Sequence, residues 1–248
     1  NPVRSYNQPD LWVAELGAGT PRNLTATYDF DINGGIGGDQ RAPRGQLPSG
    51  PIWTRDGRTI LVGAGEHGNA NLKRVDAATG KIDSVTTGNH DLMSYTADAG
   101  GQKVALILST PTVLGDLQVL DASAPAAPKP LTTFNEALFG QLTMNEPEEL
   151  WYTSFDGRKI HTLVQKPPHF EAGKKYPLIL NIHGGPHSAY GHTFAHEMQW
   201  MAARGYIVLY PNPRGSTTYG QDFANIIQHN YPESLPRLFE PFYTTKPD

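Results

Sequence analysis

Two glycines follow an apolar run in the second half of the chain, within the sequence HGGP at His183–Pro186. Acyl transfer builds negative charge on the former carbonyl oxygen, and one backbone N–H donor aimed at it contributes about 2.7–4 kcal/mol. A side chain at Gly184 or Gly185 would crowd the substrate, and glycine lets adjacent amides face one site. The motif predicts an oxyanion-binding loop, with a tight turn without chemistry as the alternative.

A second candidate loop is NPRGSTTYG at Asn212–Gly220, which follows the next apolar run. Arg214 and Tyr219, together with Pro186 of the first loop, would line the site or brace it. A structural loop that ties two strand ends together is an equally good interpretation. We therefore predict a substrate-binding or site-bracing role for these three residues.

Acyl transfer also needs a nucleophile, and Gly-x-Ser-x-Gly occurs nowhere in the 248 residues. Ser188 and Ser216 lie in the right region, but neither has glycines at both flanking second positions. We expect the chain to be truncated before the serine, acid and histidine of a triad. Oxyanion donors alone leave only residual catalysis, so we expect no substantial activity from this chain alone.

Two further motifs have ligand-binding alternatives. His192 and His196 are four residues apart beside Glu197 and near His187, but the glutamate does not lie between the histidines as in HExxH. We interpret them as solvated helix positions and predict neither a metal site nor a cofactor. The sequence GGIGGD at residues 34–39 partly matches dinucleotide and calcium motifs, and we interpret it as a flexible connection between strands.

The composition limits the classes of partner. Twenty basic and 24 acidic side chains give a net charge of −4, which does not suggest binding to nucleic acid or an anionic membrane. No cysteine is present, so disulfides and thiolate zinc sites are excluded. No apolar run has membrane-spanning length and no signal peptide is recognisable. The compartment stays undetermined, with the cytoplasm favoured.

The first region repeats itself. The segments LWVAE, LKRVD and LQVLD begin at Leu11, Leu72 and Leu117, and each is followed by a turn and a second β run. Trp53 and Tyr95 each begin another pair of strands around a glycine turn. Four short antiparallel strands per unit indicate β-propeller blades. We assign residues 1–146 to a partial propeller of about three blades, with a Gly/Pro-rich insertion between 29 and 50 that adds no strand.

From about residue 147 the pattern changes. Two strands flank the turn at Asp156–Gly157, and the apolar run LILNI at Leu178–Ile182 indicates a strand buried on both faces of a parallel sheet. Helical spacing over 192–204 ends at Gly205, and IVLYPNP follows as another strand. Residues 147–230 therefore predict a strand–helix–strand unit of an α/β domain.

At these motifs the chain resembles the prolyl oligopeptidase family of serine peptidases, most closely its acylaminoacyl-peptidase and dipeptidyl-aminopeptidase-like branch. The resemblance rests on WTRDG, on WYTSFDGRKIHTLVQKP, on HGGP and on NPRGSTTYG, where Thr218 replaces a usual glycine. It implies a propeller fragment followed by the first part of an α/β-hydrolase domain. It also implies hydrolysis of short or N-terminally acylated peptides, with Gly185 as the oxyanion donor, helped by His183 and Gly184.

Residues 231–248 depart from this pattern, and FEPFYTT resembles the phenylalanine-rich box of sensor histidine kinases. The rival interpretation of the whole chain is a non-catalytic propeller binding or scaffold module. Open sheet edges leave strand groups unpaired, so we expect such a fragment to associate with itself or with a complementary fragment.

Overall fold

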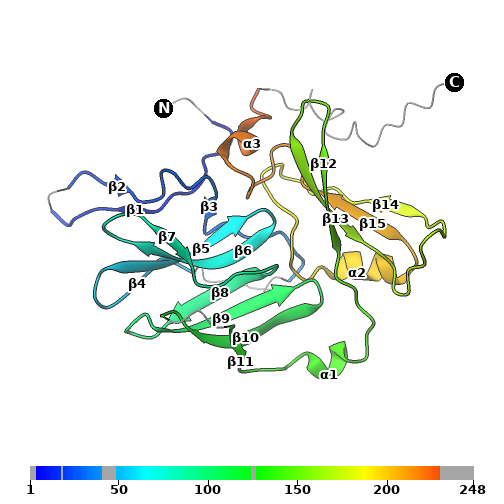
Figure 1. Cartoon of the computed structure of the whole chain (residues 1–248), viewed down its shortest axis with the longest axis horizontal. Coiled ribbons are helices and arrows are strands. Elements are labelled where there is room, and N and C mark those ends of the chain that lie inside the picture. The colour runs from blue at the N-terminus through cyan, green and yellow to red at the C-terminus, as the bar shows by residue number, and fades with distance from the viewer. Residues whose placement is uncertain (1–3, 18, 41–48, 124–126, 230–248) are drawn as a thin grey trace.

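The computed structural model describes residues 4–17, 19–40, 49–123 and 127–229, and most of its regular structure is β-strand (Figure 1). The tail at 231–248 lies outside the described residues. The first part of the chain forms two stacked antiparallel layers and a two-stranded ladder. The ladder pairs β1 (Trp12–Val13) with β2 (Arg22–Asn23).

In each antiparallel layer four consecutive strands pair in sequence order, and the first layer has a fifth, short strand as well. The four consecutive strands of the first layer are β4 (Ile52–Trp53), β5 (Thr59–Glu66), β6 (Asn69–Asp76) and β7 (Ile82–Ser84). The second consists of β8 (Asp91–Ala97), β9 (Lys103–Thr110), β10 (Val113–Asp121) and β11 (Lys129–Pro130). The predicted hairpins are confirmed, because each of the three repeated segments pairs with the β run that follows it.

The expectation that residues 29–50 add no strand is wrong. Strand β3 (Asp31–Ile32) pairs with Ala64 and Gly65 of β5, beyond the point where β4 pairs with the same strand. The edge of β5 is thus covered in two pieces, and residues 33–51 connect them. The signal was too short to recognise because only two residues make ladder contacts.

Strand β5 explains why the layers stack. Successive side chains of a strand point to opposite faces, and both faces of β5 are apolar. Leu61 is fully buried in a cluster with Leu106 of the second layer, whereas Ile60 and Val62 are buried with Leu11 beside the ladder. Neither layer could bury both faces alone, and packing against its neighbours completes the core.

The second part contains a mixed sheet in the order β12–β13–β15–β14. Its strands are β12 (Glu148–Thr153), β13 (Lys159–Gln165), β14 (Leu178–Leu180) and β15 (Ile207–Pro211). The hairpin at Asp156–Gly157 is confirmed, as is the parallel pairing of the two later strands across a helix. Helices α1 (Glu136–Phe139) and α3 (Gln221–Asn225) lie outside this unit.

The prediction that LILNI is buried on both faces is wrong for its ends. Leu178 is 55% exposed and Ile182 is 43% exposed, because among the described strands β14 pairs only with β15 and forms the sheet edge. Helix α2 (His196–Ala203) begins four residues later than predicted, so His192 precedes it. Met198 and Met201 pack against Leu163 and Val208, and Gly205 follows at φ +90°.

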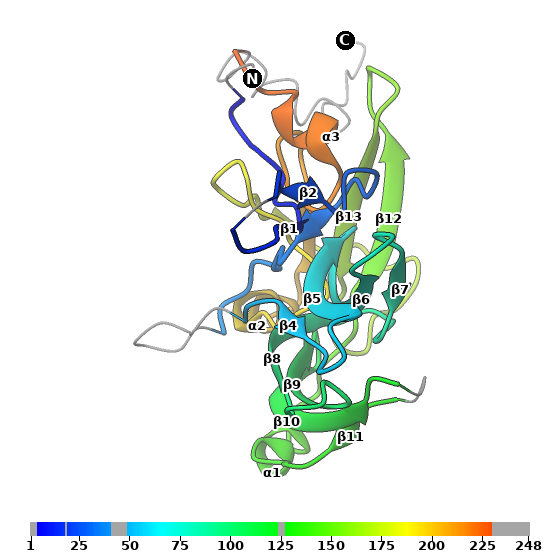
Figure 2. The same cartoon turned by 90° about the vertical axis from the view of Figure 1, so that its left-hand side faces the viewer.

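The two parts meet through the turns of the antiparallel layers (Figure 2). In the β5–β6 turn, Gly68 O accepts a hydrogen bond from His192 N at 2.9 Å, and a Cβ on Gly191 would come within 1.9 Å of that oxygen. From the β9–β10 turn, Pro111 O accepts from Gln199 Nε2 at 2.9 Å. In the described ranges, no helix has the length and apolar character needed to cross a membrane.

Candidate functional site

The loop at His183–Pro186 leaves the end of β14 and presents two glycines at the surface. Gly185 adopts φ +132°, and a Cβ there would lie 2.8 Å from His187 N, whereas a Cβ on Gly184 would meet nothing within 4 Å. Within the part of the chain that the structure describes, neither glycine amide donates a hydrogen bond to a protein acceptor. Both amides are therefore available to a ligand oxygen.

Three contacts hold this loop against the Asn212–Gly220 loop. His183 Nε2 lies 3.0 Å from Ser216 Oγ, and His187 Nδ1 donates to Gly215 O at 2.9 Å. Between them, Pro186 packs against Gly215, where an added Cβ would come within 3.1 Å of the proline ring. Burial lowers the pKa of His183, so its imidazole is neutral near pH 7.

Ser216 does not have the environment of a nucleophile. Its side chain is fully buried, and its Oγ donates to Pro213 O at 2.6 Å while facing His183. A backbone acceptor on the same loop holds the hydroxyl, which makes the serine part of the loop structure. This agrees with the absence of glycine from both flanking second positions, Arg214 and Thr218.

Arg214 points away from the glycines and braces the β12–β13 turn. Its guanidinium forms a bidentate ion pair with Asp156 and donates to Ser154 Oγ at 2.7 Å, and its Cζ lies 4.6 Å from the centre of the Phe155 ring. The side chain is buried. The arginine hydrogen bond is the largest contribution that lowers the pKa of Asp156, which keeps the pair charged. Of the two roles predicted for Arg214, substrate binding and bracing of the site, these contacts favour bracing.

Tyr219 and Asn212 form a buried polar chain beneath the loops. Asn212 exchanges hydrogen bonds with the backbone of Tyr190 at 2.7 and 2.9 Å, and its Nδ2 donates to Tyr219 Oη at 2.7 Å. Tyr219 Oη in turn lies 2.6 Å from His161 Nδ1. Burial lowers the pKa of His161 to about 4, so at neutral pH its Nδ1 can accept a hydrogen bond from the Tyr219 hydroxyl. The sequence reasoning singled out Tyr219 but missed Asn212 and His161.

The prediction that His192 is a solvated helix position is wrong. His192 is 3% exposed and its Nε2 lies 2.8 Å from Glu149 Oε1, while His161 Nε2 lies 3.7 Å from the other carboxylate oxygen. Burial alone would raise the pKa of Glu149, but the two histidines lower it overall. Glu149 is 43 positions upstream, so no local pattern revealed this pairing. Among the described residues, no group of three or more His, Asp or Glu has the arrangement of a metal site.

The glycine-rich segment at 34–39 is not a free connection. Gly37 N donates to Ala189 O at 2.7 Å, and Asp39 accepts from the backbone of Glu197 at 3.3 Å. A Cβ on Gly38 would lie 2.8 Å from the Thr193 methyl group. Glycines are needed here because the segment packs against residues 188–197. Arg41, which stands where a calcium-binding repeat has a large apolar residue, lies outside the described residues.

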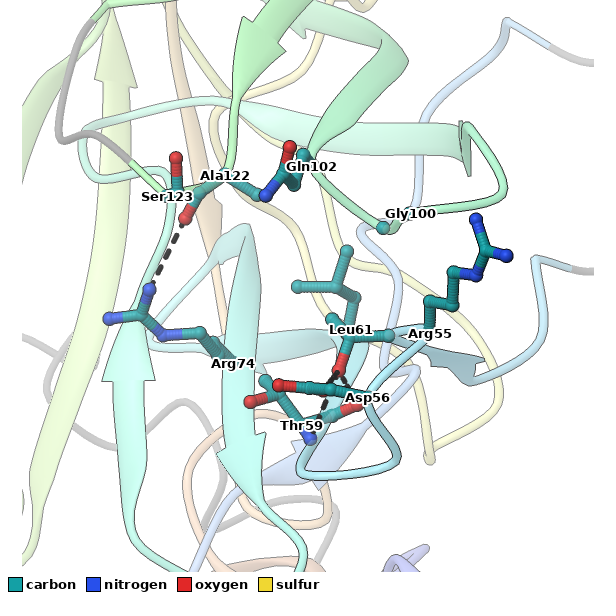
Figure 3. A pocket seen from close by; sticks show the side chains of 11 residues that line it. Arg55, Asp56, Thr59, Leu61, Arg74, Gly100, Gln102, Ala122 and Ser123 are labelled. Carbon is teal, nitrogen blue, oxygen red and sulfur yellow. Dashed lines mark hydrogen bonds between the residues drawn. The ribbon is translucent and has the colours of Figure 1, made fainter.

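A separate pocket lies at the opposite end of the two antiparallel layers (Figure 3). It has a volume of about 460 Å³, and all of its lining residues lie between Thr54 and Ser123. Arg74 crosses one wall and donates to Ala122 O at 3.3 Å. The pocket is formed by the β4–β5 and β8–β9 turns, whereas the β5–β6 and β9–β10 turns contact the second part. It is therefore distinct from the glycine loop.

Comparisons with known proteins agree with the motifs. Residues 192–235 match the model of the prolyl oligopeptidase family. The chain is 31% identical over 220 residues to the uncharacterized peptidase YuxL of Bacillus subtilis, covering 89% of this chain and 33% of that protein. It is 28% identical to dipeptidyl-peptidase 5 of Porphyromonas gingivalis, covering 89% of this chain and 30% of that protein.

A solved structure gives the same result for the fold. The acylaminoacyl peptidase of Pyrococcus horikoshii superposes with a TM-score of 0.69 at 25% identity, covering 90% of this chain and 32% of that one. The chain spans about a third of the length of the curated relatives it matches. The motifs, the fold and the relatives together point to one family. The chain belongs to the prolyl oligopeptidase family of serine peptidases.

Proposed function

We propose that this chain carries the oxyanion-binding part of a serine peptidase that hydrolyses short or N-terminally acylated peptides. The two antiparallel layers would be blades of a β-propeller, and the mixed sheet would be the first part of an α/β-hydrolase domain. Layers that bury both faces against neighbours, and a parallel strand pair crossed by a helix, support this interpretation. Relatives named dipeptidyl and acylaminoacyl peptidases support the substrate class.

The observation that carries the proposal is the pair of amides at Gly184 and Gly185, which donate to no acceptor among the described residues. They lie in the exposed middle of a loop that is held on one side at His183 and on the other at His187, which favours preorganised amides. Preorganised donors stabilise a developing oxyanion without a reorganisation cost at the moment of reaction. Gly185 would be the main donor, with Gly184 and His183 supporting it.

In this mechanism a serine attacks the scissile carbonyl carbon, and the glycine amides hold the oxygen as it becomes negative. A histidine takes the serine proton and then gives it to the leaving amine. The motif that would supply the serine does not occur in these 248 residues. We therefore propose that the chain alone binds but does not hydrolyse substrate, and that the complete polypeptide carrying this sequence does.

A fluorophosphonate probe, which modifies activated serines, tests this proposal. We expect the complete polypeptide to label once and to hydrolyse chromogenic dipeptide or acyl-amino-acid anilides, while the 248-residue chain does neither. Stoichiometric labelling of the 248-residue chain would contradict the proposal that it lacks the nucleophile. A complete polypeptide that neither labels nor hydrolyses these substrates would favour the non-catalytic scaffold alternative.

A further inference from the structure

The segment at residues 5–8 lies against helix α3, more than 200 positions later in the chain (Figure 2). The Asn225 side chain accepts from Tyr6 N at 3.2 Å and donates to Tyr6 O at 2.8 Å. Gln221 Nε2 also donates to Tyr6 O, at 2.9 Å, and its Oε1 accepts from Gln8 N at 2.8 Å. Side-chain amides thus fix the backbone on both sides of Tyr6.

The side chain of Tyr6 then reaches the glycine loop. Its ring centre lies 4.9 Å from that of His187, with the two planes 32° apart. Its hydroxyl donates to one carboxylate oxygen of Asp31, and the other oxygen accepts from Thr218 N at 2.6 Å. Asp31 is almost completely buried, so this anchor is shielded from water. Tyr6 is therefore held at its backbone and at its hydroxyl.

These contacts place His187 between two fixed groups. One face of its ring packs on Tyr6, and its Nδ1 donates to Gly215 O at 2.9 Å. His187 follows directly after Pro186 and ends the loop that carries the glycine amides. Apart from its two neighbours in the chain, no described residue comes within 4 Å of the Cβ position of Gly184. Glycine also has an unusually large conformational freedom. The loop is thus restrained mainly from its ends.

We propose that Tyr6 is a positioning residue for the oxyanion loop, acting through His187. This inference rests on the proposed function, because it assigns a catalytic consequence to the loop's position. Without the tyrosine ring, the His187 end of the loop would lose its packing partner and the two amides would sample more orientations. Displacing catalytic groups by about 1 Å can cost on the order of 100-fold in rate, so a partial loss of order should be visible in kcat.

The first test uses the 248-residue chain and needs no catalysis. Amide ¹⁵N relaxation in Tyr6→Ala should give lower order parameters at Gly184 and Gly185 than in the wild type, while Tyr6→Phe retains them through the ring. Tyr28→Ala is the matched control, since Tyr28 is also half-buried and donates to a carboxylate, that of Glu66. Unchanged glycine order parameters in Tyr6→Ala, or an equal decrease in Tyr28→Ala, would overturn the proposal. If Tyr6→Ala does not fold, Tyr6→Leu serves the same comparison.

The second test uses the complete polypeptide and anilide hydrolysis. Tyr6→Ala should lower kcat about tenfold with KM within about twofold, and Tyr6→Phe should restore most of the rate. Tyr28→Ala should leave both constants unchanged. A raised KM with unchanged kcat would contradict a positioning role. If the wild-type polypeptide hydrolyses nothing, the proposed function fails, and the relaxation data still decide whether Tyr6 orders the loop.

Discussion

Replacing each loop glycine by alanine separates backbone strain from substrate crowding. Gly185 adopts φ +132°, which L-residues rarely adopt, and its added Cβ would lie 2.8 Å from His187 N. Such a conformation costs a non-glycine residue about 1–3 kcal/mol. At Gly184 a Cβ would meet nothing within 4 Å and φ lies outside the left-handed region. We therefore expect Gly185→Ala to destabilise the chain and Gly184→Ala to change the free energy of unfolding by less than about 1 kcal/mol.

Thermal and urea denaturation of the 248-residue chain measure this difference. For a chain of this size, 1 kcal/mol shifts Tm by about 2–4 °C, so Gly185→Ala should unfold about 2–12 °C below Gly184→Ala. In the complete polypeptide both variants should lose kcat/KM, because either methyl group occupies space at the amides. Equal stability of the two variants, or full activity of Gly184→Ala, would contradict the roles assigned to these glycines.

Three further changes test the surrounding structure. Arg214→Ala should lower the free energy of unfolding by about 2–4 kcal/mol in urea titrations, because it leaves Asp156 without its buried partner. Arg158→Ala removes only an exposed contact to the same carboxylate, at 3.5 Å, and should lower the free energy of unfolding by less than about 1 kcal/mol. Tyr219→Phe should cost about 1–3 kcal/mol by the same measurement, since His161 Nδ1 loses its hydroxyl partner, and a neutral result would contradict the polar chain. Burial raises the pKa of Asp91 to about 6, so the folded state favours the protonated form and the associated stability is lost as pH rises from about 4 through 6. Relative to the wild type, the free energy of unfolding of Asp91→Asn should therefore rise by about 2–3 kcal/mol between about pH 4 and pH 7.5. If this difference stays constant over that range, the carboxyl group is not desolvated.

Local patterns predicted most elements of the first part. The Asp56–Gly57 turn and the apolar run of β5 determine the hairpin of β4 with β5 within a few residues, and Gly57 adopts φ +66° as such a turn requires. Strand β3 escaped prediction because its two residues are fixed by pairing with β5, more than 30 positions later. The division into domains at residue 146 stays a prediction.

The candidate site was predicted only in part, because local motifs indicate its loops whereas contacts between distant residues support them. HGGP and NPRGSTTYG are each a continuous stretch of sequence, and their glycines indicate where a loop needs a conformation that other residues rarely adopt. The supporting contacts join residues far apart, as with Tyr6 and Asn225 or Glu149 and His192. No periodicity in a single sequence reports such pairs. Thr218 shows a further limit, because it adopts φ +69° in place of a usual glycine and its amide is held by buried Asp31. Tertiary contacts thus maintain a backbone conformation that a β-branched residue rarely adopts.

The most direct test of the oxyanion assignment is a crystal structure of the complete polypeptide after reaction with a fluorophosphonate. The phosphonyl oxygen mimics the oxyanion, and we predict that it lies about 2.7–3.1 Å from Gly185 N, the range expected for an oxyanion donor. A phosphonyl oxygen bound by other donors, with Gly185 N beyond hydrogen-bond distance, would contradict the role assigned to this loop.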